Sequence, residues 1–370
     1  MPDLRIETWA AVLAGYSTDV QPGETVAITG GVAAEPLLRA ISRAVLARGA
    51  HPVLLPTFSD ATADLLAHAS DEQLHFISPM ERFVRAEADV MIAVSAGTNT
   101  KNLSGVDPAR QAVWNRARTT LMETSMRRAA SGERRWSSTL YPTPAYAQDA
   151  AMATDDFADF VFAACKLNDP DPIAAWRRVS AEQARLIDRL AGKAEIHILG
   201  PDTDLTLSVA GRIWINSDGH RNFPSGEIFT GPVEDSATGQ IRFTYPIIAG
   251  GREVADVRLR FEAGVVVEAT AAQNEEYLLA TLDTDPGARR LGEFAFGTNT
   301  DITRFTKNIL LDEKMGGTIH MALGAGYPDS GSQNRSAIHW DLICDLRPAS
   351  GGGRVDVDGA PFLQDGRYLV

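Results

Sequence analysis

The pattern of apolar residues changes near residue 194, and this change constrains the fold more than any other feature. Before it, two β-branched segments, ETVAITG (24–30) and HPVLLPTF (51–58), flank the amphipathic segment EPLLRAISRAVLARGA (35–50), which has proline in its first turn and glycine near its end, as helices often do. DVMIAVSAG (89–97) has the composition of a further strand. Strand–helix–strand units of this kind predict an open, mostly parallel sheet with helices on its faces.

The middle of the chain is predicted to be mainly helical. Residues 102–165 have helical character except at RRWSSTLYPTPAYAQ (134–148), where prolines and aromatic residues predict a packed, ordered loop. DPDPIAAWRRVSAEQARLIDRLAGK (169–193) keeps apolar residues at helical spacing and begins with aspartates that can cap a helix. We place the boundary between two domains near the end of this helix.

The C-terminal half has the pattern of short strands. Segments such as EIHILG (195–200) and TDLTLSVAG (203–211) are separated by Gly, Asp, Asn and Pro residues that favour turns. The predicted fold class is therefore α/β. An N-terminal, Rossmann-like domain with an open, mostly parallel α/β sheet (1–190) precedes a C-terminal, β-rich α+β domain (191–370).

Charge and cysteine content limit the partners and the compartment of the chain. The net charge is −13 and no extended run of Lys or Arg is present, so neither a nucleic acid nor an anionic membrane is an expected partner. No apolar run approaches the ~20 residues that cross a bilayer, and no signal peptide is visible. Cys165 and Cys344 are far apart in apolar segments, as expected of reduced thiols in the core. Together these features predict a cytoplasmic protein.

One predicted strand places two polar residues in an unusual position. In SAIHWDLICDL (336–346) apolar residues occupy both faces except at His339 and Asp341, which project from the same face because they lie two residues apart. A buried carboxylate requires a compensating charge nearby. A metal ion can supply it, but a His–Asp hydrogen bond or an arginine partner such as Arg335 or Arg347 would satisfy the same requirement.

A second histidine lies in the preceding strand. His320 occurs within GGTIHMALGAGYP (316–328), an apolar run flanked by glycines that let backbones approach closely. We therefore expect two buried histidines and an aspartate to converge on neighbouring strands. Nitrogen and carboxylate ligands together suit Zn, Co, Mn or Fe.

Two glutamates stand in similar surroundings. Glu227 lies between a Pro-Ser-Gly turn and a strand start in RNFPSGEIFTGP (221–232), and Glu293 lies in the apolar segment RRLGEFAFGTN (289–299). Taken alone, either glutamate could be an exposed turn residue. With the histidines and the aspartate they give three carboxylates and two imidazoles, enough to hold two divalent metal ions that share a bridging water. The predicted metal ligands are Glu227, Glu293, His320, His339 and Asp341.

The order of these segments resembles that of a known family. NFPSGEIFTGP, LGEFAFGTN, LLDEKMGGTIHMALGAGYP and SAIHWD are similar to motifs of the aminopeptidase T and aminopeptidase S family of metallopeptidases, which are dinuclear, thermophilic-type enzymes. The likeness extends over nearly the whole chain, including RRWSSTLYPTPAYAQDAAMA in the first domain. In that family Glu, Glu, His, His and Asp hold two metals in this order. The resemblance therefore assigns the same roles to the five residues above and makes the C-terminal domain the catalytic one.

The resemblance also implies a reaction and an assembly. The family has a tyrosine shortly after the first ligand histidine, which falls on Tyr327 and could stabilise a developing oxyanion with its phenolic hydrogen. Tyr327 and Glu293 are the expected catalytic residues. The implied function is a metal-dependent aminopeptidase, a hydrolase that uses two divalent ions (Zn, Co or Mn) to release N-terminal amino acids from peptides with a free N-terminus. The implied assembly is a homodimer.

Two other functions remain open at this point. His320, His339 and Asp341 alone would form the two-histidine, one-carboxylate set of a mononuclear Fe(II) ring-cleaving dioxygenase. The presence of Glu227 and Glu293 favours two metals instead. A non-catalytic protein that keeps a metal only for folding is the other alternative, although structural zinc sites seldom use three carboxylates.

A charged tripeptide just before His320 is harder to interpret. Glu313 could act as a general base or as a partner of a ligand, and Lys314 could offset the negative charge of the site. A solvated charged turn would explain these residues and Asp312 equally well. His220 is close to Glu227 in sequence, but its polar neighbours predict a surface turn.

Overall fold

The computed structural model describes residues 3–249 and 252–369, and packing divides the chain into two compact units. Unit 1 comprises Met1–Ala175 and Gly219–Pro224, and unit 2 comprises Trp176–Asp218 and Ser225–Val370. The short segment 219–224 thus returns to unit 1 after unit 2 has begun. The boundary at residue 190, between domains 1–190 and 191–370, stays a prediction.

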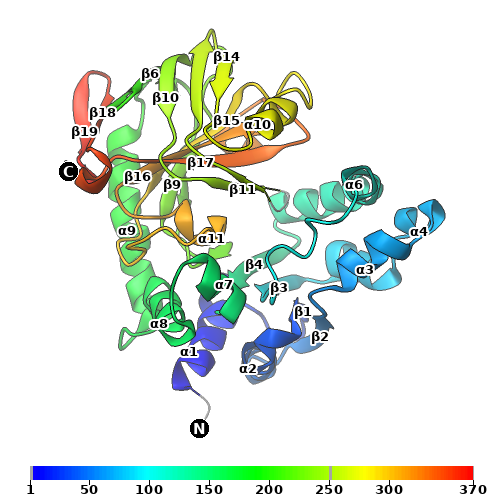
Figure 1. Cartoon of the computed structure of the whole chain (residues 1–370). Helices are drawn as coiled ribbons and strands as arrows, with labels where there is room; N and C mark the ends of the chain where they lie inside the picture. Colours follow the sequence, from blue (N-terminus) through cyan, green and yellow to red (C-terminus); the bar gives the residue numbers. More distant parts are fainter. Residues whose placement is uncertain (1–2, 250–251, 370) are drawn as a thin grey trace. The chain divides into compact units, whose positions relative to one another are not determined.

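Unit 1 is built on a parallel sheet of five strands (Figure 1). Its strand order is β2-β1-β3-β4-β8, and every neighbouring pair is parallel. This arrangement confirms the open, parallel sheet expected from the alternation of strands and helices. The strands are β1 (Thr25–Gly31), β2 (His51–Thr57), β3 (Val90–Ser95), β4 (Arg135–Leu140) and β8 (Asn222–Phe223).

Helices connect the strands of unit 1. In α2 the helical spacing directs Leu37, Ile41 and Val45 into the core, and the helix ends just before Gly49, whose φ is +76°. The helices are α1 (Leu4–Val12), α2 (Glu35–Ala47), α3 (Ala61–His68), α4 (Asp71–His75), α5 (Pro79–Arg82), α6 (Pro108–Ala130), α7 (Pro144–Asp149) and α8 (Thr154–Ala164), with short 3-10 or π segments at Leu13–Ser17, Val32–Ala34 and Phe83–Glu87.

The prediction of a loop over residues 134–148 is wrong. Its first part forms β4, a strand with a neighbour on each side, and its second part begins α7. Ser137, Thr139 and Leu140 are buried, although serine and threonine gave the segment a polar appearance in sequence. Pairing with β3 and β8 satisfies the backbone of this strand, so its long-range neighbours rather than its own apolar content determine its structure.

Unit 2 is rich in β-structure, as predicted. Its helices are α9 (Pro172–Leu190), which begins in unit 1, α10 (Glu275–Leu282) and α11 (Ile309–Asp312). A sheet of eight strands has the order β14-β13-β10-β6-β5-β18-β19-β20, and a sheet of five has the order β17-β16-β15-β9-β7. The larger sheet contains β5 (Glu195–Gly200), β6 (Thr203–Ser208), β10 (Thr238–Arg242), β13 (Arg258–Glu262), β14 (Val265–Thr270), β18 (Arg354–Val357), β19 (Ala360–Gln364) and β20 (Arg367–Tyr368); β11 (Ile247–Ala249) pairs with β12 (Arg252–Val254); the smaller sheet contains β7 (Ile215–Ser217), β9 (Glu227–Thr230), β15 (Leu291–Gly297), β16 (Thr318–Gly324) and β17 (His339–Asp345).

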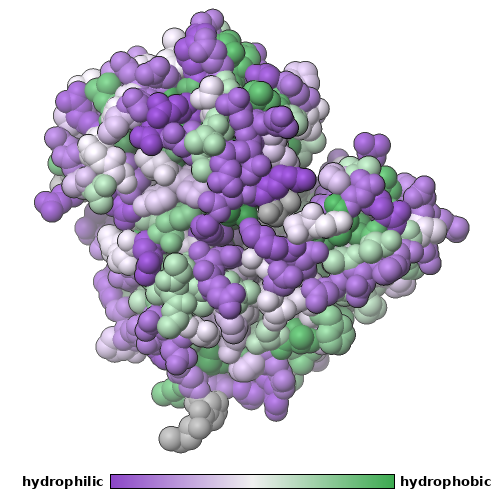
Figure 2. Space-filling model, in the orientation of Figure 1, coloured by the Kyte–Doolittle hydropathy of each residue, from purple (hydrophilic) through white to green (hydrophobic). Residues whose placement is uncertain are grey.

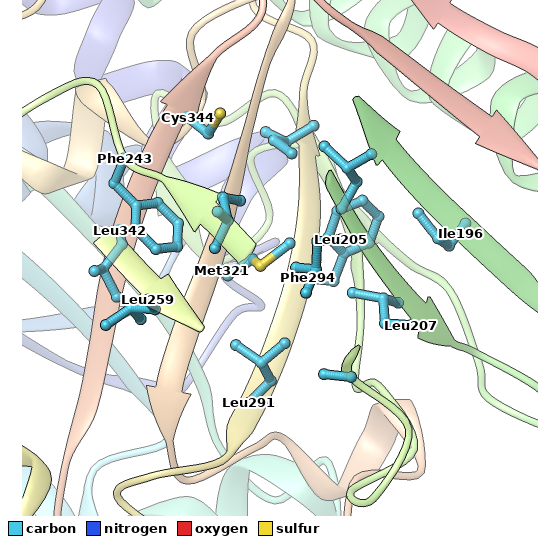
Figure 3. Close-up of a cluster of buried hydrophobic side chains, with 14 of the residues drawn as sticks. Ile196, Leu205, Leu207, Phe243, Leu259, Leu291, Phe294, Met321, Leu342 and Cys344 are labelled. Carbon is cyan, nitrogen blue, oxygen red and sulfur yellow. The ribbon is translucent and has the colours of Figure 1, made fainter. Parts of the chain in front are cut away.

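One face of the five-stranded sheet packs into the core of unit 2. Because side chains alternate along a strand, every second residue of β15, β16 and β17 points to this face. Phe294, Met321 and Leu342 occupy neighbouring positions there and are completely buried. Figure 3 shows these three side chains in one cluster with Leu205 and Leu259 of the eight-stranded sheet. The opposite face of the five-stranded sheet is therefore left for other side chains.

A β-bulge in β15 decides which residues reach that opposite face. Leu291 pairs with Leu323, and Glu293 pairs with Ala322, so Gly292 is the additional residue between two registers. In a regular strand without the bulge, Leu291 and Glu293 would share a face, since they lie two residues apart. The bulge lets Leu291 join the core cluster while Glu293 lies on the other face.

The face of the molecule drawn in Figure 2 is mixed in character. Figure 2 shows hydrophilic residues over much of the face that it presents, with hydrophobic residues in smaller patches between them. Scattered apolar side chains of this kind are normal on protein surfaces. Within the described residues, no helix has both the length and the apolar character needed to cross a bilayer.

Replacing Gly292 with alanine is expected to destabilise unit 2. The added Cβ would lie 2.4 Å from the carbonyl oxygen of Gly324, so the backbone must move, at a cost of about 1–3 kcal/mol in the free energy of unfolding. Chemical denaturation would measure this cost. Gly200→Ala is the control, because its Cβ would meet no atom closer than 3.5 Å. A Gly292→Ala protein as stable as the control would contradict the assigned register.

Candidate metal centre

Four strands of the five-stranded sheet carry the predicted ligands on its second face. The backbone register places Glu293 opposite Ala322 and Ala322 opposite Asp341, so these three lie in one row across the sheet. Small residues, Ala295 and Ala322, occupy positions between the ligands in this register. The ligands come from β9 (Glu227), β15 (Glu293), β16 (His320) and β17 (His339 and Asp341).

The five predicted ligands converge. Nε2 of His320 lies 3.1 Å from Oε1 of Glu293 and 3.8 Å from Oε2 of Glu227. Nε2 of His339 lies 3.7 Å from Oε2 of Glu293 and 3.4 Å from Oδ1 of Asp341. Glu293 therefore stands between the two histidines and directs one oxygen to each.

Burial and ion pairing decide two of the alternatives that the sequence left open. Glu227 and Glu293 are each only 5% exposed, which excludes the interpretation of either as an exposed turn residue. Arg347 pairs with Asp345 at 2.8 Å rather than with Asp341.

The expectation of two buried histidines holds for His320 alone. The side chain of His339 is 28% exposed, against 1% for His320. His339 is the first residue of β17, and the residues before it are not in a strand, so fewer neighbours cover its side chain. The prediction that both histidines are buried is wrong in this respect.

Backbone carbonyl groups fix the orientation of both imidazole rings. Nδ1 of His320 lies 2.9 Å from the carbonyl oxygen of Glu313, and Nδ1 of His339 lies 2.7 Å from that of Ala325. A carbonyl oxygen can only accept a hydrogen bond, so each Nδ1 donates its hydrogen. In the neutral ring Nε2 then carries a free lone pair, and it faces the carboxylates. This is the tautomer that metal ligation through Nε2 requires.

The surrounding carboxylates favour protonated imidazoles in the metal-free protein. Burial opposes the charge of His320, but the hydrogen bond with Glu293 and the charge of Glu227 outweigh it and raise its pKa to about 9. Burial likewise opposes the charge of His339, and Asp341 and Glu293 raise its pKa to about 10. For Asp341 the burial effect is overcome by His339, which lowers its pKa, whereas burial raises the pKa of Glu293.

The charged tripeptide before His320 is buried, so it is not a solvated turn. Asp312 is 1%, Glu313 9% and Lys314 0% exposed. The ammonium of Lys314 donates to Oε1 of Glu313 and lies 3.4 Å from Oε1 of Glu227. These carboxylates outweigh the effect of burial and hold the pKa of Lys314 above its ordinary value. Sequence analysis assigned Lys314 no definite role. The apolar residues on both sides of Asp312, Glu313 and Lys314 were the signal that could have predicted their burial.

Tyr327 lies beside the ligands. Its ring centre is 5.2 Å from that of His339 and 5.5 Å from that of Phe229, and the residue remains 39% exposed. Burial of the hydroxyl and the nearby carboxylates raise its pKa well above the ordinary value. The phenol therefore keeps its hydrogen at neutral pH and can donate it.

The residues fit a site for divalent metal ions. One ligand atom each from Glu293, His320 and Asp341 lies within 4.8 Å of the other two. Oε2 of Glu227 is buried and has no hydrogen-bond partner among the described residues, although an unpaired carboxylate oxygen is costly to bury. A cation near His320 would compensate that oxygen. Carboxylate and imidazole donors together suit Zn, Co, Mn or Fe.

The remaining histidines take no part in this cluster. His51, His68, His75 and His220 are exposed and belong to unit 1. His197, in unit 2, pairs with Asp204 at 2.8 Å on the eight-stranded sheet.

A model of one protein family matches nearly the whole chain. It covers residues 3–368 and describes a thermophilic metalloprotease (M29). Among related proteins, aminopeptidase 2 of Geobacillus stearothermophilus is 29% identical, over 98% of this chain and 95% of that protein. The match spans both units.

Two solved structures share the fold. Wild-type AmpT from Thermus thermophilus has a TM-score of 0.83 at 26% identity, with 99% of each chain covered. A 2,5-dihydroxypyridine dioxygenase from Pseudomonas putida has a TM-score of 0.58 at 15% identity, over 99% of this chain and 97% of that one. The second likeness concerns the fold alone. The first agrees with the α/β class predicted from the sequence.

Metal binding is expected to release protons at neutral pH. His320 and His339 have pKa values of about 9 and 10 in the metal-free protein, so both are protonated at pH 7, whereas a metal needs neutral imidazoles. The apparent affinity for Co²⁺ should therefore rise with pH until about pH 10, the higher of these two values. Calorimetric titration in buffers with different ionisation enthalpies measures the released protons. A binding enthalpy that is the same in every buffer at pH 7 would contradict these protonation states.

Proposed function

The chain belongs to the thermophilic metalloprotease family M29, which its match over residues 3–368 shows, and on this basis we propose that it is a metal-dependent aminopeptidase. Relatives named aminopeptidase cover almost its entire length. The observation that carries the proposal is the position of Glu293, whose two oxygens face His320 at 3.1 Å and His339 at 3.7 Å. A carboxylate between two histidines can bridge two metal ions.

We assign the metal ions to five side chains. Glu227 and Glu293 approach His320, and Glu293 and Asp341 approach His339. This grouping supports two ions per chain with Glu293 shared between them. Zn, Co and Mn are the candidates, because the ligands combine imidazole nitrogen with carboxylate oxygen.

The protein's own groups prepare the site for peptide hydrolysis. When bound, divalent ions supply an activated water at neutral pH and polarise a carbonyl group. The carbonyl groups of Glu313 and Ala325 keep both imidazoles in the ligating tautomer. Tyr327, beside His339, keeps its phenolic hydrogen and can donate it to the oxygen that becomes negative during attack on the peptide. Glu293 stays the second expected catalytic residue, because it lies beside both histidines of the cluster.

The substrates that we propose are peptides with a free N-terminus, in agreement with the names of the relatives. The chain also fits a cytoplasmic protein, because Cys165 and Cys344 are both buried thiols outside any disulfide in the structure. Assembly as a homodimer is part of the same proposal and rests on family resemblance. Analytical ultracentrifugation would test it.

A dioxygenase and a metal scaffold are less well supported. A mononuclear Fe(II) site would use His320, His339 and Asp341. It would leave Glu227 and Glu293 as buried charges directed at the same histidines. A scaffold would have the same difficulty, since structural zinc sites rarely contain carboxylates in this number. The arrangement of both glutamates favours hydrolysis with two metals.

Loss of a proposed ligand is expected to abolish peptide hydrolysis. Metal-free protein restored with Co²⁺, Zn²⁺, Mn²⁺ or Fe²⁺ should hydrolyse aminoacyl anilides, and Glu293→Ala and His339→Ala should remain inactive with every metal. His197→Ala is a matched control, because His197 pairs with an aspartate outside the cluster. Metal analysis should give two ions per chain for the wild-type protein. Oxygen consumption without anilide hydrolysis would favour the dioxygenase instead.

Removing the hydroxyl of Tyr327 is expected to slow the reaction without weakening substrate binding. Tyr327→Phe keeps the ring contacts with His339 and Phe229, so kcat should fall by about 100-fold, as for loss of one oxyanion donor, while KM changes little. Tyr277→Phe is the control, because the Tyr277 ring packs against Trp340 on the core face. An unchanged kcat for Tyr327→Phe would remove this residue from the proposed mechanism.

A further inference from the structure

Lys314 is a fully buried cation in contact with two carboxylates. Its side chain is 0% exposed, and burying an ammonium group costs several kcal/mol unless its surroundings compensate. It donates to Oε1 of Glu313 and lies 3.4 Å from Oε1 of Glu227. A lysine held in this way restricts the orientation of both carboxylates.

The two oxygens of Glu227 have different surroundings. Oε1 faces the ammonium of Lys314, whereas Oε2 has no hydrogen-bond partner among the described residues and lies 3.8 Å from Nε2 of His320. A free glutamate could rotate and offer a metal either oxygen or both. The contact with Lys314 removes this choice.

We propose that Lys314 is a positioning residue of the metal centre, which holds Oε1 of Glu227 so that Oε2 alone is presented to a metal ion. This inference rests on the proposed function, since it takes Glu227 as a ligand. Lys314 itself touches neither metal nor substrate in this proposal. It acts through Glu227, and it also separates the like charges of Glu227 and Glu313.

Two hydrogen bonds hold the backbone of Lys314 in place. The Lys314 N–H donates to the carbonyl oxygen of Leu311 at 3.1 Å, and its carbonyl oxygen accepts from the N–H of Asn299 at 3.0 Å. Gly297 allows this close approach, because a Cβ there would lie 3.1 Å from the carbonyl carbon of Lys314 and 2.2 Å from the oxygen of Met315. The ammonium therefore projects from an anchored segment.

The backbone of Glu227 is anchored independently of its carboxylate. The side-chain amide of Gln183, on α9, donates to the carbonyl oxygen of Glu227, and Glu227 pairs with Ser217 on one side and Gly297 on the other. With the backbone fixed, rotation of the side chain is the remaining freedom. Lys314 restricts that rotation.

Removing the ammonium tests the proposal through metal binding, before any activity is measured. Lys314→Met keeps an unbranched side chain that is one atom shorter and removes its charge. We expect one of the two Co²⁺ ions to bind about 10- to 100-fold more weakly, as when a group that orients a ligand is lost, with a changed visible absorption spectrum. Lys307→Met is the control, because Lys307 pairs with Glu253 at 2.8 Å in a partly exposed ion pair and should retain wild-type affinities.

A double variant separates positioning from simple neutralisation. Glu313→Gln combined with Lys314→Met removes one acidic and one basic side chain together, so the loss of the ammonium is compensated by the loss of a carboxylate beside it. If Lys314 positions Glu227, the weakened Co²⁺ site should persist in the double variant. Wild-type affinity in the double variant, or in Lys314→Met itself, would overturn the proposal.

A measurement on the unaltered protein covers the case in which these variants do not fold. Anomalous diffraction from the Co²⁺-loaded wild-type protein should place a metal on Oε2 of Glu227 with Lys314 bonded to Oε1. A metal bound to Oε1, or to both oxygens, would refute the proposal. Because these readouts need no substrate, a protein that binds Co²⁺ as described but does not hydrolyse anilides would contradict the proposed function while supporting the role of Lys314.

Discussion

The metal centre depends on the alternation of side chains between the two faces of one sheet. Each ligand has an apolar neighbour in sequence that is buried in the core cluster, as Phe294 is beside Glu293 and Met321 beside His320. Packing of these neighbours on one face fixes the strands, and the strands then fix the ligands on the other face. The bulge at Gly292 gives β15 the same arrangement, with Leu291 in the core and Glu293 on the ligand face. Apolar burial on one face thus holds the charged side chains in place on the other.

The turn before β16 connects several of these effects. The carbonyl group of Glu313 accepts the hydrogen bond that orients His320, and the next residue, Lys314, contacts Glu227. One short segment therefore acts on ligands from two different strands. Asp312 ties the same segment down by accepting hydrogen bonds from the backbone and the hydroxyl of Thr306, each at 2.7 Å. Ligand geometry consequently depends on the folding of this turn as well as on the sheet.

Sequence reasoning succeeded where local periodicity carries the information. The two-residue spacing of His339 and Asp341 predicted their common face, and glycine-bounded apolar segments drew attention to Glu293 and His320. It failed where long-range neighbours decide the outcome. Lys314 lies in a charged tripeptide that looks solvated, yet tertiary packing buries it completely. In the same way β4 owes its structure to the strands on either side, and no local pattern announces a two-residue strand such as β8.

The return of the chain to unit 1 has a consequence for where the protein can be divided. Strand β8 pairs with β4 in unit 1, and Glu227, four residues after the end of β8, opens β9 in unit 2. A fragment that starts after residue 190 would still carry Phe223, a buried residue, without the sheet to which it belongs. A division of the chain at residue 190 therefore separates β8 from the sheet with which it pairs.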